Sequence, residues 1–287
     1  MRSPLINVHD AYLQSDALLF DCRFELNDPT AGERAYDIAH LPQARYLNLD
    51  KNLSGEKNGH NGRHPLPPRE QLAQTLRNHG LMHTTPVIVY DAHGGLFAAR
   101  AWWLLRWLGH RYVQVLDGGL QAWQKAGLPL ATPSKKSPPT SAISYQASNF
   151  FPSADAAMPI VDAQAIMDRL AQPVSQTRLL DARSPDRFRG ENETLDLIAG
   201  HIPGALNRFF KDNLTADGYF KSAAQLHAEF EQLLGTNLST VIHQCGSGVS
   251  ACHNLLAMEI ASLPSGALYP GSWSEWSSDA TRPIARG

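Results

Sequence analysis

Two stretches of this sequence repeat one another and decide the fold. LLFDCRFEL at residues 18–26 and RLLDARSPDRF at residues 178–188 are both short apolar runs that end in Asp-x-Arg. Three further pairs recur in the same order: AHLPQARYLNLD (39–50) with AGHIPGALN (199–207), PVIVYDAHGG (86–95) with TVIHQCGSGV (240–249), and LDGGLQAW (116–123) with YPGSWSEW (269–276). A period of about 155 residues is too long for a solenoid and indicates a duplicated domain.

Each copy alternates short apolar runs with helical patterns. The predicted strands are Ala17–Phe20, Val87–Tyr90, Tyr112–Leu116, Leu179–Leu180, Val241–His243 and Ala267–Tyr269. The predicted helices include Arg69–Arg77, Ala98–Leu108, Ser222–Leu234 and Cys252–Ile260. Apolar strands that alternate with helices predict an α/β fold in which each copy has a parallel sheet with helices on both faces.

The stretch between the two copies is rich in Pro, Ser, Thr and Ala, and such a composition cannot build a core. We therefore predict an N-terminal domain at residues 1–137, a linker at 138–157 and a C-terminal domain at 158–287.

Composition excludes several classes of function. The 287 residues hold 25 Lys and Arg against 27 Asp and Glu, a formal net charge of −2, so no nucleic-acid partner is expected. The most apolar stretch, Leu96–Leu108, is interrupted by Arg100 and Arg106, so no membrane span is expected. Three Cys residues and the lack of an apolar leader before His9 favour free thiols in a cytoplasmic protein.

Cys245 is the candidate nucleophile. It directly follows the predicted strand Thr240–Gln244 and opens the loop CGSGVSA, and parallel sheets place their sites at this end of the strands. Two glycines let the loop curl with its N–H groups turned inward, and the following helix dipole also favours a thiolate. The alternative is an ordinary Gly-rich turn with an incidental Cys. A phosphatase of the C-x5-R type needs Arg where this chain has Ala251, so persulfide chemistry is favoured over phosphoryl transfer.

With these motifs in view, the sequence resembles the two-domain rhodanese superfamily and, within it, the 3-mercaptopyruvate sulfurtransferases. Both copies carry its Asp-x-Arg, His-[Ile/Leu]-Pro-x-Ala and Gly-x-x-x-x-Trp landmarks. The loop CGSGVSA is similar to the mercaptopyruvate form CG[ST]GVTA, whereas thiosulfate enzymes place Arg and Lys where this chain has Gly246 and Ser247. Asp91 stands at the Cys position of the first copy, which implies that this copy is catalytically inactive.

The resemblance implies roles for several residues. Ser247 would help to protonate the departing enolate, with His64 in GRHPLP and Asp50 in LNLD as the relay behind it. The alternative is that His64 and Asp50 are two polar residues that line a domain interface. His40 and His201 recur in both copies and are expected to fix loops.

The resemblance also implies a substrate-binding set. Arg187, in an Arg-Phe-x-Gly context, matches a substrate Arg of the family, although Asp186 replaces the usual Gly. The loop residues expected to hold substrate or the outer sulfur are Gly246, Gly248, Val249 and Ser250. The family's second substrate Arg has no counterpart in ENETLDLIAG (191–200), so another residue is expected to serve.

The function implied is sulfur transfer from 3-mercaptopyruvate, through a persulfide on Cys245, to cyanide, a thiol or a thioredoxin-like protein. No cofactor is needed for this chemistry, and no CxxC pair suggests a metal. Two alternatives stay open: a thiosulfate sulfurtransferase of the same fold, and a non-catalytic regulatory module that binds an anion in the same loop.

Overall fold

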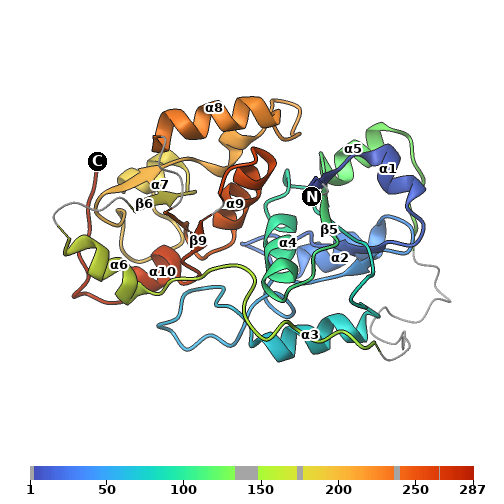
Figure 1. Cartoon of the computed structure of the whole chain (residues 1–287), viewed down its shortest axis with the longest axis horizontal. Coiled ribbons are helices and arrows are strands. Elements are labelled where there is room, and N and C mark those ends of the chain that lie inside the picture. The colour runs from blue at the N-terminus through green and yellow to red at the C-terminus, as the bar shows by residue number, and fades with distance from the viewer. Residues whose placement is uncertain (1–2, 133–147, 173–176, 236–239, 265) are drawn as a thin grey trace. The chain divides into compact units, whose positions relative to one another are not determined.

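The computed structural model of the chain describes residues 3–132, 148–172, 177–235, 240–264 and 266–287 (Figure 1). The chain divides into two compact units, Met1–Gly55 with Pro67–Ala157, and Glu56–Leu66 with Met158–Gly287. The second unit therefore includes an eleven-residue segment from the first half of the sequence, Glu56–Leu66, which the sequence did not predict. Part of the predicted linker lies outside the described residues.

The first unit is built on a five-stranded parallel sheet in the order β1-β5-β4-β2-β3. Its strands are β1 (Leu5–Ile6), β2 (Leu18–Asp21), β3 (Arg45–Tyr46), β4 (Val87–Tyr90) and β5 (Val113–Leu116). Its helices are α1 (Val8–Leu13), α2 (Ala31–Ile38), α3 (Arg69–Asn78), α4 (Ala98–Trp107) and α5 (Gly119–Lys125).

The second unit has a four-stranded parallel sheet in the corresponding order, β7-β6-β8-β9. Its strands are β6 (Arg178–Asp181), β7 (Ala205–Asn207), β8 (Val241–Gln244) and β9 (Ala267–Leu268). Its helices are α6 (Ala163–Leu170), α7 (Pro185–Arg189), α8 (Ala223–Leu234), α9 (Ser250–Ile260) and α10 (Ser272–Trp276), with a 3-10 turn, η2 (Phe210–Asn213). The α9 helix begins at Ser250, two residues earlier than predicted.

Helices cover both faces of each sheet, as the sequence predicts. Every residue of β2, β4 and β8 is buried, which a sheet open to water on one face would not allow. In the second unit, Leu179 and Ile242 pack with Trp273 on one face of the sheet. The α8 and α9 helices lie on the other face (Figure 1). Among the described residues, no helix is long and apolar enough to cross a lipid bilayer.

The repeated His landmarks make the same contacts in both units. The ring of His40 stacks on Tyr36 at 3.9 Å and its Nδ1 lies 2.8 Å from the Tyr36 carbonyl oxygen. His201 stacks on Phe188 at 3.9 Å, with its Nδ1 2.8 Å from that residue's carbonyl oxygen. This duplicated arrangement confirms that both histidines fix loops.

The Asp-x-Arg landmarks are also structural. Arg23 pairs with buried Asp21 at 2.6 Å, and Arg183 pairs with buried Asp181 at 2.7 Å. Each pair stands at the end of a strand and ties the following loop to the sheet. The loops that follow β2 and β6 are therefore tied to their sheets by the same kind of ion pair in both units.

Candidate active site

Cys245 lies where the sequence places it, in the first position after β8. Its side chain is buried in the described structure, with 2 % exposure. The loop from Cys245 to Val249 turns directly into α9, and Gly248 adopts a left-handed φ of 74°. A Cβ on Gly248 would lie 2.4 Å from the carbonyl oxygen of Pro270, so only glycine fits this turn. The loop is therefore a tight and specified structure and not an open surface turn.

The neighbouring α10 helix anchors this loop. The N–H of Trp273 donates to the carbonyl of Cys245 at 3.0 Å, and the N–H of Ser274 donates to the carbonyl of Gly246 at 2.9 Å. The hydroxyl of Ser272 accepts from the N–H of Cys245 at 3.1 Å. Ser272 holds an unusual φ of 53°, a region that costs a non-glycine residue about 1–3 kcal/mol. The sequence did not single out Ser272, although its place beside the Gly-x-x-x-x-Trp landmark was a usable signal.

The first unit shows what the equivalent loop does with an anion. The Asp91 carboxylate accepts four backbone N–H groups, from His93 and Phe97 at 2.8 Å and from Gly95 and Ala98 at 2.9 Å. The N–H groups of this loop therefore form an anion-binding nest, and the Asp91 carboxylate is the anion that they bind. The segment between Asp91 and the start of α4 is two residues longer than the segment between Cys245 and the start of α9.

His64 and Ser247 meet as the resemblance implies. A hydrogen bond of 2.7 Å joins His64 Nδ1 to Ser247 Oγ, and both side chains are buried. His64 belongs to the segment Glu56–Leu66 of the second unit, so this contact lies within one compact unit. Asp50 belongs to the first unit, where its N–H donates to Asn48 Oδ1 at 2.9 Å, and its part in a relay stays a prediction.

Arg187 projects from α7 and is held by a buried acid that the sequence did not single out. Its Nε and Nη2 donate to the Glu193 carboxylate at distances of 2.8–3.2 Å. Burial works against the charge of Glu193, but hydrogen bonds from Arg187 and from the Leu195 amide outweigh burial and lower the pKa of this carboxyl. Arg187 is thereby fixed as a guanidinium at the edge of the site.

A second guanidinium, that of Arg63, joins Arg187 beside the loop. Arg63 Nη1 is hydrogen-bonded to Asp196, which also accepts from Arg187 Nη2 at 3.4 Å. The Cα of Gly246 faces both side chains, because a Cβ added there would lie 2.8 Å from Arg63 Nη2 and 3.5 Å from Arg187 Nη2. Burial outweighs the attraction of Arg63 and raises the pKa of Asp196.

A third arginine, Arg183, lies behind the loop. Its guanidinium stacks over the Trp273 ring at 4.8 Å and reaches Glu193 at 3.4 Å. Burial disfavours its charge, but the carboxylates of Asp181 and Glu193 outweigh burial and raise the pKa of Arg183. The guanidinium of Arg183 is therefore held behind the loop by two buried acids, Asp181 and Glu193.

The other two cysteines are buried, as a structural role requires. The Cys252 thiol donates to the Gly248 carbonyl at 3.3 Å. Burial, Asp21 and Asp91 raise the pKa of Cys22 well above its usual value, which keeps it a thiol. Neither residue has the environment of a nucleophile.

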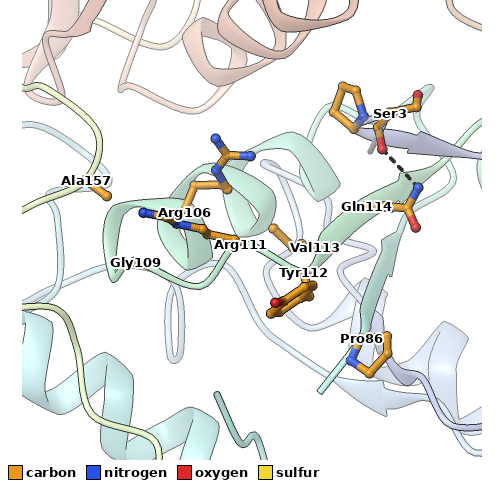
Figure 2. Close-up of a pocket in the computed structure, with 10 residues that line it drawn as sticks. Ser3, Pro86, Arg106, Gly109, Arg111, Tyr112, Val113, Gln114 and Ala157 are labelled. Atoms are coloured by element: carbon orange, nitrogen blue, oxygen red, sulfur yellow. Dashed lines mark hydrogen bonds between the residues drawn. The ribbon is translucent and has the colours of Figure 1, made fainter. Parts of the chain in front are cut away.

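A separate cavity of about 530 Å³ lies at the amino-terminal ends of β4 and β5 in the first unit (Figure 2). Arg106, Arg111 and Tyr112 line it, and Gln114 Nε2 donates to the Ser3 carbonyl at 2.9 Å on its rim. No Cys or His is among its lining residues, and Asp91 lies at the other end of β4. The thiol chemistry of this protein is therefore not located there.

Two His pairs, His60 with His64 and His79 with His83, have the H-x-x-x-H spacing found in some metal sites. Among the residues that the structure describes, no group of three His, Cys, Asp or Glu side chains is arranged to hold a metal ion.

Fold and site together define a class: a duplicated α/β protein with a buried thiol in a tight glycine-containing loop at the end of a parallel strand. The chain belongs to the rhodanese family, since the model of the rhodanese-like domain matches residues 7–126 and 162–279.

Known proteins agree with this assignment. The chain is 46 % identical over 277 residues to a Pseudomonas aeruginosa protein named "Probable 3-mercaptopyruvate sulfurtransferase", covering 96 % of this chain and 94 % of that one. It is 33 % identical to the mouse thiosulfate sulfurtransferase, covering 74 % of this chain and 69 % of that one. The solved 3-mercaptopyruvate sulfurtransferase of Leishmania major superposes with a TM-score of 0.84 at 29 % identity, over 99 % of this chain and 77 % of that one.

Proposed function

We propose that this protein transfers sulfur from 3-mercaptopyruvate to a thiophilic acceptor through a persulfide on Cys245. The observation that carries the proposal is the anion nest in the first unit, where the loop N–H groups hold the Asp91 carboxylate. Because the second unit repeats the fold and has Cys245 at the Asp91 position, its shorter loop is suited to hold a thiolate and then an anionic persulfide. Gly246, Gly248, Val249 and Ser250 supply the backbone of that loop.

The first half-reaction is a displacement at sulfur. The Cys245 thiolate attacks the sulfur of 3-mercaptopyruvate, a sulfur–sulfur bond forms, and the carbon–sulfur bond breaks. The electron pair of the broken bond stays with the carbon fragment, which leaves as the enolate of pyruvate and takes up a proton. Ser247, joined to His64 by a hydrogen bond of 2.7 Å, is placed to supply that proton. In our proposal Asp50 completes the relay behind His64.

In the second half-reaction a thiolate or cyanide attacks the outer sulfur and restores the Cys245 thiolate. We propose a small thiol, cyanide or a thioredoxin-like protein as acceptor, since each supplies a soft nucleophile. We also propose a cytoplasmic setting, because a reducing compartment keeps Cys22, Cys245 and Cys252 as free thiols.

Formal charge favours a donor with one carboxylate. Beside Gly246, the cations Arg63 and Arg187 face the acids Glu193 and Asp196, so this group is formally neutral. Thiosulfate would bring two negative charges next to a thiolate without a surplus of cations, and close like charges repel in a site of low dielectric.

The thiosulfate reaction is the second candidate, because the mouse relative carries that name and two guanidiniums lie at the loop. The kcat/KM values for the two donors decide between them, and we expect 3-mercaptopyruvate to be preferred by at least about tenfold.

The test of the persulfide is direct. Protein treated with 3-mercaptopyruvate is digested without reductant, and the mass of the Cys245 peptide is measured. We expect that peptide to gain one sulfur atom and one pyruvate to be released for each persulfide formed. The Cys252→Ser variant is the matched control and should still be loaded, whereas Cys245→Ser should not. An unmodified Cys245 peptide in active protein would refute the proposal.

A further inference from the structure

Arg63 occupies a place that the mechanism above does not use. It comes from the segment Glu56–Leu66, far in sequence from the loop, and its guanidinium lies against Gly246. Gly246 directly follows Cys245, and neighbouring Cα atoms are only about 3.8 Å apart. The Arg63 guanidinium therefore lies beside the residue next to the candidate nucleophile.

The position of Arg63 is fixed at three points. Its N–H donates to Ser274 Oγ at 3.0 Å, and its Nη1 is hydrogen-bonded to buried Asp196. The preceding Gly62 lies so close to Gly271 that an added Cβ would come within 2.7 Å of its carbonyl oxygen. Arg63 is thus anchored by backbone and side chain alike, unlike a solvated surface arginine.

Asp196 sets Arg63 and Arg187 side by side. It accepts from Arg63 through Oδ1 and from Arg187 through Oδ2. Glu193 accepts from Nε and Nη2 of Arg187, and Nη2 and Nη1 of this guanidinium lie 3.5 and 3.7 Å from the position of a Cβ added to Gly246. Arg63 Nη2 lies 2.8 Å from the same position. One N–H-bearing nitrogen of each arginine therefore converges on one point beside the loop.

We propose that Arg63 is the second guanidinium of the donor site, and that it binds the donor's carboxylate together with Arg187. This inference rests on the proposed function for the identity of the donor, but the carboxylate site itself follows from the geometry. It also accounts for the segment 191–200, which supplies the acids Glu193 and Asp196 where a second substrate arginine was expected. Asp196 is then a positioning residue that holds both arginines in place.

The experiment compares two alkylating agents that differ only in a carboxylate. Iodoacetate carries a carboxylate and iodoacetamide a neutral amide, and the rate constant of each is measured at the Cys245 peptide by mass spectrometry. In Arg63→Gln we expect the ratio of the iodoacetate rate to the iodoacetamide rate to fall by about tenfold, because a charge-assisted contact is lost. The KM for 3-mercaptopyruvate should rise by about 10- to 100-fold.

Two further variants keep the test sharp. Arg189→Gln is the matched control, since Arg189 is exposed and paired with Glu191, and its ratio should stay within about twofold of the wild type. The double variant Arg63→Gln/Asp196→Asn keeps the formal charge balanced if the single variant folds poorly, and its ratio should fall as well.

The outcomes separate the two proposals. If the ratio is unchanged in both Arg63 variants while the wild type uses 3-mercaptopyruvate, Arg63 is only an ion-pair partner of Asp196 and the inference is wrong. If the ratio falls but the wild type does not use 3-mercaptopyruvate, the carboxylate site stands and the proposed donor is wrong.

Discussion

Replacing Gly246 with alanine tests the guanidinium pair without removing either arginine. The new Cβ would lie 2.8 Å from Arg63 Nη2, whereas ordinary contact begins at 3.4 Å, so this nitrogen must move by about 0.6 Å. Arg187 Nη2, at 3.5 Å, need not move. A misplacement of about 1 Å in a binding site can cost about a hundredfold, so we expect kcat/KM for 3-mercaptopyruvate to fall by about tenfold.

The stability of the same variant should hardly change. The atoms that must move are the ends of flexible side chains, and Gly246 does not need a left-handed backbone, so we expect a loss below about 1 kcal/mol in the free energy of unfolding. Gly248→Ala is the contrasting control. Its Cβ would meet backbone oxygen at 2.4 Å with φ at 74°, so a loss of several kcal/mol is expected.

Steady-state kinetics and urea unfolding of both variants measure these quantities. Full kcat/KM in a folded Gly246→Ala protein would mean that the Arg63 guanidinium does not contact the donor. Equal destabilisation of both variants would mean that the loop, and not the arginines, limits the space at residue 246.

Three further outcomes are expected. Cys245→Ser should fold and lose all turnover, because a hydroxyl cannot carry a persulfide, whereas Cys252→Ser should keep most of its activity. Ser272→Ala removes the acceptor of the buried Cys245 N–H and should cost about 1–3 kcal/mol in urea unfolding, with a lower kcat; wild-type values for both would refute a role for this hydroxyl. Burial lowers the pKa of His110 from 6.5 to about 4, so the unfolded chain binds its proton first as the pH falls. The free energy of unfolding should therefore drop by about 3 kcal/mol between pH 6.5 and 4 through this group. His110→Gln should flatten that dependence, and an unchanged slope would contradict it.

The sequence alone determined the duplicated α/β fold and singled out Cys245 as the candidate nucleophile. Runs such as Val87–Tyr90 are short and apolar at every position, which is typical of a strand covered on both faces and can be recognised locally. Cys245 follows its strand directly, and the end of a parallel strand is where such folds place their chemistry. The family resemblance added Ser247, His64 and Arg187, because each lies within a short motif.

The tertiary structure decided the partners of those residues. Nothing in the sequence around Glu56–Leu66 indicates that this segment packs in the second unit, and the ion pair of Arg63 with Asp196 joins residues 133 positions apart. The acids Glu193 and Asp196 look like solvated surface charges in the sequence and are nearly buried in the fold. Charged residues have no periodic pattern that predicts their pairing, because the energy of an ion pair depends on distance and burial, and the folded chain alone sets both.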